Sequence, residues 1–354
     1  MGIAFNSGEY QVEKSTWNDV KLEIYHHESH HYTIKNMMLG MKSALEYNSA
    51  HFSPYPHKEL KIIEFPLSEG TYATLFGNTI LTSEVRFGVN TKEEDKIDLS
   101  FYVIAHELTH QWFGNNLLPK DVLGAVMLTE SITEYISLKI YEQKFGKKRA
   151  KQFLNMQRLR YLKGRTRETQ GESPLYLVKA EQDYISYGKG ALAFNAIAQV
   201  LGEKKLNEIL QSFLNDFQSN ESKYPTTLDF LERLKRETPH EYQYIITDWF
   251  EKSVFYDIEI KTAFQKEINN SFEVSLDFTL KKQNSDSEDL LTINDLMEIG
   301  FYDKNDTLIE LKQVFVKEIQ NKLSFPLAKK PSKIVLDPNF LGIEKDVNNN
   351  VFSF

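Results

Sequence analysis

Apolar residues in the middle of the chain recur at the spacing of an amphipathic helix. Between residues 101 and 112 they follow one another at intervals of three or four positions: Phe101, Ile104, Ala105, Leu108 and Trp112. Positions with this spacing collect on one face of a helix, and that face is normally buried. Asp98 stands where a helix N-cap is expected, and Gly114-Asn115 stands where the helix would stop. The pattern therefore predicts a half-buried helix that starts after Asp98.

Other segments show helical or alternating patterns. A second apolar stripe at helical spacing includes Ile132, Tyr135, Ile136 and Ile140, and an earlier helical pattern covers residues 33–52. Strand-like runs occupy residues 60–66 and 79–88. These patterns predict a region that mixes strands with helices and becomes almost wholly helical after residue 98.

Both ends of the chain alternate in the manner of strands. Residues 8–25 alternate on either side of the turn-like Trp17-Asn18-Asp19. From residue 255 onward, short alternating segments are separated by clusters of Asn, Asp and Ser. The second pattern is typical of a small β-sandwich.

The helix that follows Asp98 carries the motif His106-Glu107-x-x-His110. The motif alone is weak evidence, because short patterns of this kind arise by chance. The two histidines are one helical turn apart and share a face that differs from the apolar stripe, which is what a metal site on a helix requires. A catalytic zinc ion needs a third protein ligand and leaves its fourth position to water.

The next predicted helix supplies two carboxylates, Glu130 and Glu134, one turn apart on a face other than its apolar stripe. We take Glu130 as the third metal ligand. Glu134 is then suited to hold a zinc-bound histidine, His106, by its other ring nitrogen and so to fix its tautomer and orientation. The alternative, in which Glu134 belongs to a solvated face, stays open.

Composition fits a globular protein with more than one domain, since 41% of the residues are hydrophobic and 26% are charged. The net charge of −8 makes nucleic acid an unsuitable partner. The chain has no cysteine, so its sequence is compatible with any redox compartment. No apolar run approaches the roughly eighteen residues of a membrane span, and no signal-peptide core stands at the N-terminus.

The stretches HELTHQWFGN and LTESITEY resemble the aminopeptidase N family of zinc metallopeptidases, which are gluzincins. That family separates the second histidine from the ligand glutamate by eighteen residues, whereas nineteen separate His110 from Glu130 here. Thr129 and Ser131 replace the usual Asn and Gly beside that glutamate. One extra residue is tolerable because the two helices, and not the connecting loop, set the geometry. The likeness covers roughly residues 8 to 256.

The segment DYISYGKGALAFNAI is similar to the Y-x-K-G-A segment of the same family. The resemblance places Tyr187 at the tyrosine that stabilises the transition state, where a phenol can meet charge on the scissile carbonyl oxygen. It also implies one zinc ion on His106, His110 and Glu130, which lowers the pKa of water to about 7. Glu107 would then accept the proton of that water and pass it to the leaving amine.

Patterns and resemblance together predict an α+β fold. A thermolysin-like catalytic domain, with a sheet lobe and then a helical lobe, would precede a small β-sandwich. Residues 1–25 would be the remnant of an N-terminal β-sheet domain, residues 26–256 the zinc metallopeptidase domain, and residues 257–354 the β-sandwich domain.

One motif of the family is missing. Its aminopeptidases carry G-x-M-E-N, whose Glu binds the α-ammonium of the substrate, and the matching stretch here is EGTYATLFGNTILTSE. Depending on the alignment, Ala73 or Phe76 takes the place of that Glu, and neither can bind an ammonium group. Glu69 and Glu84 are the remaining candidates. The residues that bind substrate therefore stay unassigned, and so does the restriction to the N-terminus of a peptide.

We predict a zinc metallopeptidase that is aminopeptidase-like and lacks the ammonium-binding Glu. The alternative is a non-catalytic interaction or sensor module of a membrane transport complex that keeps a structural zinc. Retention of Glu107 and Tyr187 argues against this alternative, because a structural site needs neither.

The chain begins within what resembles a domain, so we expect a fragment of a longer protein, such as an ABC-transporter permease fused to this peptidase domain. The expected partners are a peptide substrate and, in that arrangement, the permease portion. The chain as given is expected to be soluble. Anchoring to a membrane through a missing N-terminal part and a cytoplasmic location remain the two alternatives. Side-chain preference and oligomeric state do not follow from the sequence.

The stretch YHHESHHY contains His26, His27, His30 and His31. If it were helical, histidines four positions apart could share a metal ion. The segment lies where a strand gives way to a helix, and no downstream carboxylate pattern completes a site. We interpret it mainly as a polar surface junction.

Overall fold

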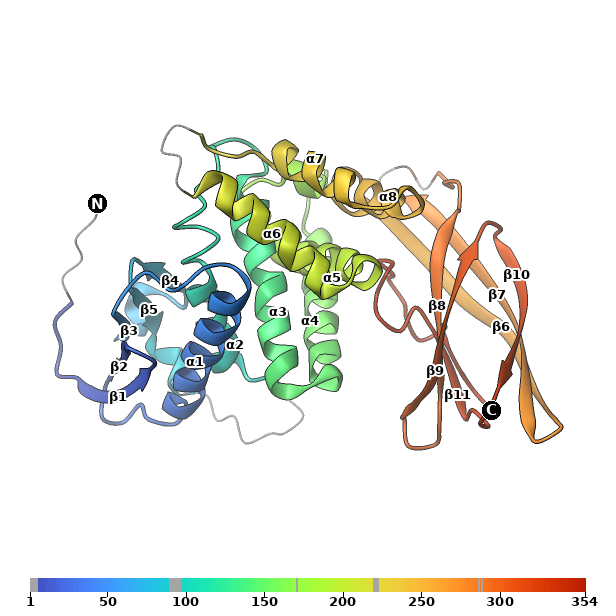
Figure 1. Ribbon diagram of the computed structural model, residues 1–354, viewed down its shortest axis with the longest axis horizontal. Helices are drawn as coiled ribbons and strands as arrows, with labels where there is room; N and C mark the ends of the chain where they lie inside the picture. The colour runs from blue at the N-terminus through green and yellow to red at the C-terminus, as the bar shows by residue number, and fades with distance from the viewer. Residues whose placement is uncertain (1–5, 89–96, 170, 219–222, 286, 288) are drawn as a thin grey trace. The chain divides into compact units, whose positions relative to one another are not determined.

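The computed structural model describes residues 6–88, 97–169, 171–218, 223–285, 287 and 289–354. Figure 1 shows the helices and strands along the chain. The chain divides into two compact units, which we name the first unit (Met1–Asn155 and Asn207–Thr227) and the second unit (Met156–Leu206 and Leu228–Phe354). Helices and sheets together give the α+β fold that the sequence predicts. The predicted domain boundaries after residues 25 and 256 stay predictions.

The first unit contains a sheet whose described strands run in the order β1-β2-β3-β5-β4. Its strands are β1 (Gln11–Trp17), β2 (Val20–His26), β3 (Glu59–Phe65), β4 (Ala73–Phe76) and β5 (Thr79–Ser83). β1 and β2 form the predicted antiparallel pair, and Asn18 in their turn has a φ of 48°. β2 is parallel to β3, and β3 is parallel to β5. The C-terminal ends of β2, β3 and β5 therefore lie at the same edge of the sheet.

The first unit also contains helices. They are α1 (Ile34–His51), α2 (Leu99–Thr109), α3 (Ile132–Phe145), the start of α4 (Lys147–Arg165) and most of α6 (Glu203–Phe217). α1 contacts β1, β2, α2 and α3. It crosses α2 closely at Gly40, where a Cβ atom would lie 2.8 Å from the carbonyl oxygen of Phe101. Asn48 also donates a hydrogen bond of 2.9 Å to the hydroxyl of Thr109. α1 thus holds α2 from one side.

The helical pattern of residues 33–52 and the strand-like run of residues 60–66 are confirmed by α1 and β3. The predicted stop at Gly114-Asn115 is wrong by a few residues, because α2 ends at Thr109. Beyond it, the amides of Asn115, Asn116 and Leu117 donate to carbonyls five residues earlier in the chain. Before them, the amides of His110, Gln111 and Trp112 donate to carbonyls three residues earlier. Tighter and then wider turns therefore replace α-helical bonding, although the apolar spacing continues to Trp112.

The second unit begins with the end of α4 and continues with short helical segments. They are the 3₁₀ helices η4 (Leu175–Leu177) and η6 (His240–Tyr242), the π-helices η5 (Tyr184–Lys189) and η7 (Thr247–Glu251), and the α-helices α5 (Gly190–Leu201), α7 (Thr227–Glu237) and α8 (Gln243–Ile246). No helix in the described part of the chain is long and apolar enough to cross a lipid bilayer.

Two antiparallel sheets form the rest of the second unit, as Figure 1 shows. Their described strands run in the orders β10-β7-β6 and β12-β11-β8-β9. These strands are β6 (Val254–Ile268), β7 (Ser271–Asn284), β8 (Asp295–Tyr302), β9 (Leu308–Val316), β10 (Gln320–Leu327), β11 (Lys333–Leu336) and β12 (Val351–Ser353). Phe278 of one sheet and Phe301 and Ile334 of the other belong to one buried core. The predicted β-sandwich is confirmed.

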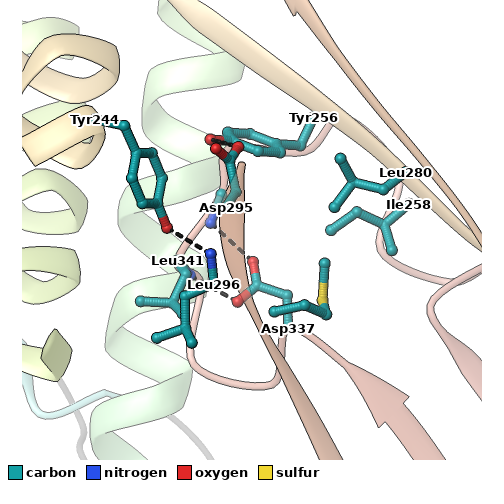
Figure 2. A pocket seen from close by; sticks show the side chains of 10 residues that line it. Tyr244, Tyr256, Ile258, Leu280, Asp295, Leu296, Asp337 and Leu341 are labelled. Carbon is teal, nitrogen blue, oxygen red and sulfur yellow. Dashed lines mark hydrogen bonds between the residues drawn. The ribbon is translucent and has the colours of Figure 1, made fainter. Parts of the chain in front are cut away.

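A buried cluster of charged side chains lies at the start of the sandwich. The Lys282 ammonium is 2.6 Å from Asp248 Oδ2 and 3.1 Å from Asp295 Oδ2. Figure 2 shows Asp295 together with Tyr244 and Tyr256 around a cavity of about 10 Å³. A cavity of this size holds no more than one water molecule, so it is unsuited to a substrate.

Candidate active site

Helix α2 begins and buries its apolar face as the sequence predicts. The carboxylate of Asp98 accepts a hydrogen bond of 3.0 Å from the backbone amide of Phe101, which confirms the predicted N-cap. Ile104 and Leu108 are buried in the core. Because one face of α2 is fixed in this way, His106 is presented from a different face.

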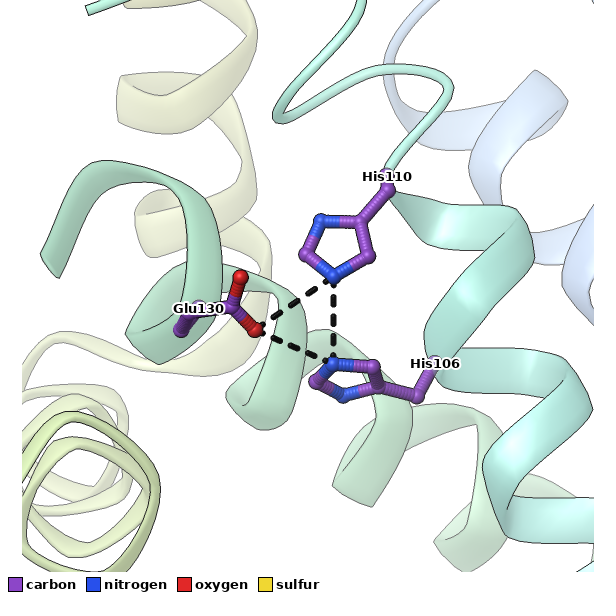
Figure 3. A group of neighbouring side chains, drawn as sticks. All are labelled: His106, His110 and Glu130. Atoms are coloured by element: carbon purple, nitrogen blue, oxygen red, sulfur yellow. Dashed lines mark hydrogen bonds and ion pairs between the residues drawn. The ribbon is translucent and has the colours of Figure 1, made fainter. Parts of the chain in front are cut away.

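Three of the predicted site residues meet at one point of the first unit. Figure 3 shows His106 and His110 of α2 pointing toward Glu130. The Nε2 atoms of the two histidines are 3.2 Å apart, and Glu130 Oε2 lies 3.3 Å from His106 Nε2 and 3.4 Å from His110 Nε2. Donor atoms around a tetrahedral zinc ion lie about 3.3–3.4 Å from one another. The donor set and its spacing therefore fit a zinc ion without rearrangement.

In both histidines the second ring nitrogen, Nδ1, contacts another oxygen of the chain. His106 Nδ1 lies 2.9 Å from Glu134 Oε2, and His110 Nδ1 lies 3.0 Å from the carbonyl oxygen of Phe113. The Tyr102 hydroxyl is 2.8 Å from both carboxylate oxygens of Glu134, whose side chain is fully buried. A proton on each Nδ1 leaves both Nε2 lone pairs directed at the shared point, which is the arrangement that metal-binding histidines use.

Glu130 lies in a π-helical turn, η3 (Met127–Ser131), which runs directly into α3. The sequence predicts a helix here but gives no sign of the wider turn. Single π-helical turns are rare in proteins, and those that occur are often found at functional sites. The turn brings Glu130 to the Nε2 atoms of the two histidines, while Glu134 in α3 contacts the Nδ1 atom of His106.

The charges of the cluster are strongly coupled. Burial opposes a charged His106, but hydrogen bonds with Glu130 and Glu134 and the charges of Glu134 and Glu107 outweigh it and raise the pKa of His106 to about 10. Burial also opposes a charged Glu130, yet hydrogen bonds and charges from His106 and His110 hold its pKa well below the usual value. The cluster therefore favours positive charge at its centre.

Glu107 follows His106 in α2, and only 9% of its surface is exposed. Burial raises the pKa of Glu107, although the charges of His106, His110 and Arg86 act in the opposite direction. A carboxyl group with a raised pKa beside a set of candidate metal ligands is suited to accept and return a proton.

A family model for the peptidase family M1 domain matches residues 37–249, which is more than half of the chain. The chain belongs to peptidase family M1. The matched segment contains the three clustered residues His106, His110 and Glu130, as well as Glu107 and Tyr187.

Curated relatives of this M1 chain are described as aminopeptidases. Probable aminopeptidase 1 of Sulfurisphaera tokodaii is 27% identical over 193 residues, which are 50% of this chain and 23% of that protein. Aminopeptidase M1-B of Oryza sativa subsp. japonica is 24% identical over 254 residues, which are 67% of this chain and 28% of that protein. The M1 chain thus spans about a quarter of the length of these relatives.

A solved structure shares the fold. The crystal structure of aminopeptidase A from Legionella pneumophila, in complex with aspartic acid, matches with a TM-score of 0.59 and 17% sequence identity. The match covers 96% of the M1 chain and 38% of that structure. At this identity the likeness supports the fold alone.

Tyr187 belongs to the second unit, in the π-helix η5. The Arg160 guanidinium lies over its ring, 4.2 Å from the centroid. The next residue, Gly188, packs tightly against α4, and a Cβ atom there would lie 2.9 Å from the carbonyl oxygen of Gln157. Close packing therefore fixes the segment that carries Tyr187, whose role in this M1 chain stays a prediction.

The edge strand β4 packs against α2 in the first unit. The segment of residues 70–78, which contains β4, has no carboxylate side chain. Ala73 is partly buried, and Phe76 is 58% exposed. Glu69 is exposed at the end of the 3₁₀ helix η1 (Leu67–Glu69). Glu84 begins the 3₁₀ helix η2 (Glu84–Arg86), and its carboxylate accepts a hydrogen bond of 2.7 Å from the Leu67 amide.

Two residues of the site were missed in the sequence. Tyr102 stands one helical turn before His106, so the spacing of α2 could have indicated it. Arg86 is remote from the motif in the sequence, and no local pattern marks it. Its guanidinium donates a hydrogen bond of 3.4 Å to the carbonyl oxygen of Thr71, and its charge opposes the rise in the pKa of Glu107.

Proposed function

We propose that this chain hydrolyses peptide bonds with one zinc ion held by His106, His110 and Glu130. The observation that carries the proposal is the triangle of donor atoms, with separations of 3.2, 3.3 and 3.4 Å. Membership of peptidase family M1 supports the same chemistry. When bound, zinc acts as a Lewis acid that makes water nucleophilic at neutral pH and polarises the scissile carbonyl.

Four residues have distinct roles in this proposal or in its support. Glu107 accepts the proton of the attacking water and delivers it to the leaving amine, which the raised pKa of its carboxyl supports. Tyr187 donates a hydrogen bond to the carbonyl oxygen as negative charge develops on it. Glu134 keeps His106 oriented through Nδ1.

We further propose that the chain does not depend on a free N-terminus in its substrate. A confined ammonium group without a carboxylate partner costs several kcal/mol. Residues 70–78 offer no such partner. Arg86 adds a positive charge within electrostatic range of Glu107. We therefore expect weak activity on single amino-acid anilides and better cleavage of longer or N-acetylated peptides.

Digestion of a mixed peptide library by metal-loaded protein, followed by mass spectrometry, tests the activity and its mode together. Each peptide is supplied with a free and with an N-acetylated terminus. Cleavage of both forms supports the proposal. Strong activity on alanyl or leucyl anilide that N-acetylation abolishes would show that the ammonium site has been rebuilt from other residues.

The metal ligands are tested separately by elemental analysis. His110→Ala should lose the active-site zinc and the hydrolysis. If metal-loaded wild type cleaves no peptide at all, the non-catalytic module of a transport complex becomes the better description. Fusion to a permease and attachment to a membrane stay predictions from the sequence.

A further inference from the structure

A second cluster of histidine and carboxylate side chains lies at the edge of the sheet where β2, β3 and β5 end. It consists of His30, Glu64 and Glu84, whose donor atoms all lie within 4.8 Å of one another. His30 comes from the loop after β2, Glu64 from β3 and Glu84 from η2 after β5. We propose that this cluster binds a divalent transition-metal ion, separate from the active-site zinc.

The two carboxylates give the cluster a negative charge. The Glu64 side chain is fully buried, and Glu84 is partly buried. Among the described residues, no lysine or arginine forms an ion pair with either carboxylate. His30 Nδ1 lies 2.5 Å from Glu64 Oε1. Even a protonated imidazole would leave one negative charge, and a buried charge without compensation is costly. A divalent cation beside a neutral imidazole removes that imbalance.

Backbone amides orient both carboxylates. The His27 amide donates to Glu64 Oε2 at 2.8 Å, and the Leu67 amide donates to Glu84 Oε1 at 2.7 Å. The two amides belong to different segments of the chain, and each leaves the other carboxylate oxygen free to face the centre of the cluster. Outer partners of this kind hold metal ligands in place and reduce the ordering that binding requires.

Thr82 provides an independent sign of a missing partner. It lies directly beside Glu64 in the parallel register of β5 and β3, so both side chains project from the same face of the sheet. Thr82 is fully buried, and its hydroxyl has no hydrogen-bond partner among the described residues. An unsatisfied buried hydroxyl costs about 1–3 kcal/mol. A water molecule on the bound ion would satisfy it.

The position and the donor types agree with a metal site. Ligands of open α/β sheets bind beyond the carboxyl ends of parallel strands. One imidazole nitrogen with two carboxylate oxygens suits zinc and its neighbours better than calcium or magnesium, which prefer oxygen donors alone. The contact between His30 and Glu64 would have to open to about 3.3 Å around a tetrahedral ion. His30 can move, since it lies in a loop and its side chain is 30% exposed.

The YHHESHHY stretch is therefore not uniform. His26 is buried, with 3% of its surface exposed, which differs from the polar surface junction that the sequence suggests. His30 belongs to the cluster. His31 is exposed, and its Nδ1 lies 3.3 Å from the carbonyl oxygen of Glu28. His31 is thus a matched control for His30 in the same loop.

Zinc stoichiometry tests the proposal. Metal-free protein is dialysed against zinc, and bound metal is counted by elemental analysis after folding is checked by circular dichroism. Wild type and His31→Ala should bind two ions, His30→Ala and His110→Ala one each, and the double variant of His30 and His110 none. Should His30→Ala not fold, Glu84→Gln replaces it and should lose the same ion.

Loss of one ion from His30→Ala and none from His31→Ala supports the second site. Equal zinc content in wild type and His30→Ala overturns it. An equal loss in His30→Ala and His31→Ala also overturns it, because the histidines would then bind zinc only as an exposed surface cluster. The result for His110→Ala reports on the proposed active site alone, so the two proposals can fail independently.

Discussion

Two charged clusters in each unit balance their carboxylates by different means. In two clusters of the second unit, buried carboxylates face cations of the chain itself, whereas Glu298 and Glu344 of the same unit accept hydrogen bonds from amide groups. Glu172 lies 2.7 Å from Arg165 Nε and 3.3 Å from Lys189 Nζ, and Lys282 lies between Asp248 and Asp295. These ammonium and guanidinium groups are part of the chain, so each cluster has its positive charge without a bound ion.

In the first unit the carboxylates of Glu130 and Glu64 face histidines instead. Within the described ranges, no lysine or arginine forms an ion pair with either of them. An imidazole can be neutral and can donate a lone pair to a metal, which an ammonium group cannot. The difference suggests that carboxylates paired with lysine or arginine serve stability. Carboxylates that contact histidine can instead bind an exchangeable cation.

The largest effect is expected from Glu107→Gln. The amide cannot accept the proton of the attacking water, so kcat should fall by about 10²–10⁴-fold while zinc content stays unchanged. Glu46→Gln, which alters an exposed carboxylate on α1, is the control. Steady-state hydrolysis and elemental analysis on the same samples decide the matter, and equal turnover in Glu107→Gln and wild type would exclude Glu107 as the base.

In the second unit, Lys282→Met should destabilise the fold by about 3–5 kcal/mol, because it leaves Asp248 and Asp295 buried without a cation. The adjacent Lys281 forms an exposed pair with Asp257, in which the two side chains are 47% and 51% exposed. Lys281→Met should therefore cost less than about 1 kcal/mol. Denaturant unfolding measures both. Similar losses in the two variants would contradict the stabilising role of the buried cluster of Lys282 with Asp248 and Asp295.

Zinc should stabilise the first unit selectively. At a free concentration of 100 times its Kd, a bound ion contributes about 2.7 kcal/mol, which corresponds to roughly 100-fold slower amide exchange from states that release the metal. Hydrogen exchange with and without a chelator should show this protection in α2 and α3 but not in β7 and β8. Equal protection of both units would contradict the contrast between them.

A smaller effect is expected at Glu134, which contacts the Nδ1 atom of His106. Glu134→Gln keeps the shape of the side chain but removes the charge beside His106 Nδ1, so zinc affinity should fall by about 10–100-fold. Glu142→Gln changes a carboxylate on the same helix that pairs with Lys139, and it should leave zinc affinity unchanged. Competition with a chromophoric chelator measures both constants. An unchanged affinity in Glu134→Gln would return Glu134 to a purely structural role.

The smallest effect is expected at Gly114, whose φ is 148°. An alanine Cβ there would lie 3.0 Å from the carbonyl oxygen of His110 and 3.3 Å from its Nδ1. Gly114→Ala should cost about 1 kcal/mol and weaken zinc binding slightly. Gly146→Ala imposes a similar backbone strain at a φ of 82° with no atom nearby, so it should lower stability without affecting zinc.

Local sequence patterns were sufficient to predict several structural features of this chain. Asp98, the apolar stripe of α2 and the four-residue spacing of His106 and His110 lie within one short window. A helix places residues four positions apart on one face whatever surrounds it, so the pairing of the histidines follows from the sequence. Alternation along β6 to β11 indicated the sandwich for the same reason, because the period of a strand is also local. The helical pattern of the next segment supplied Glu130 and Glu134 as candidates, and likeness to a known family then supplied Tyr187.

The tertiary structure decided what lies beyond such windows. The π-helical turn at Glu130 has no signature in the apolar spacing, and Tyr102 is joined to Glu134 only because α2 packs against α3. His30, Glu64 and Glu84 are far apart in the sequence and share no motif. They meet because parallel pairing of β2, β3 and β5 brings three strand ends to one edge of the sheet. Hydrogen bonds within a helix or strand set local periods, whereas register and packing between elements depend on residues far apart in the chain, and these determined which carboxylate faces which histidine.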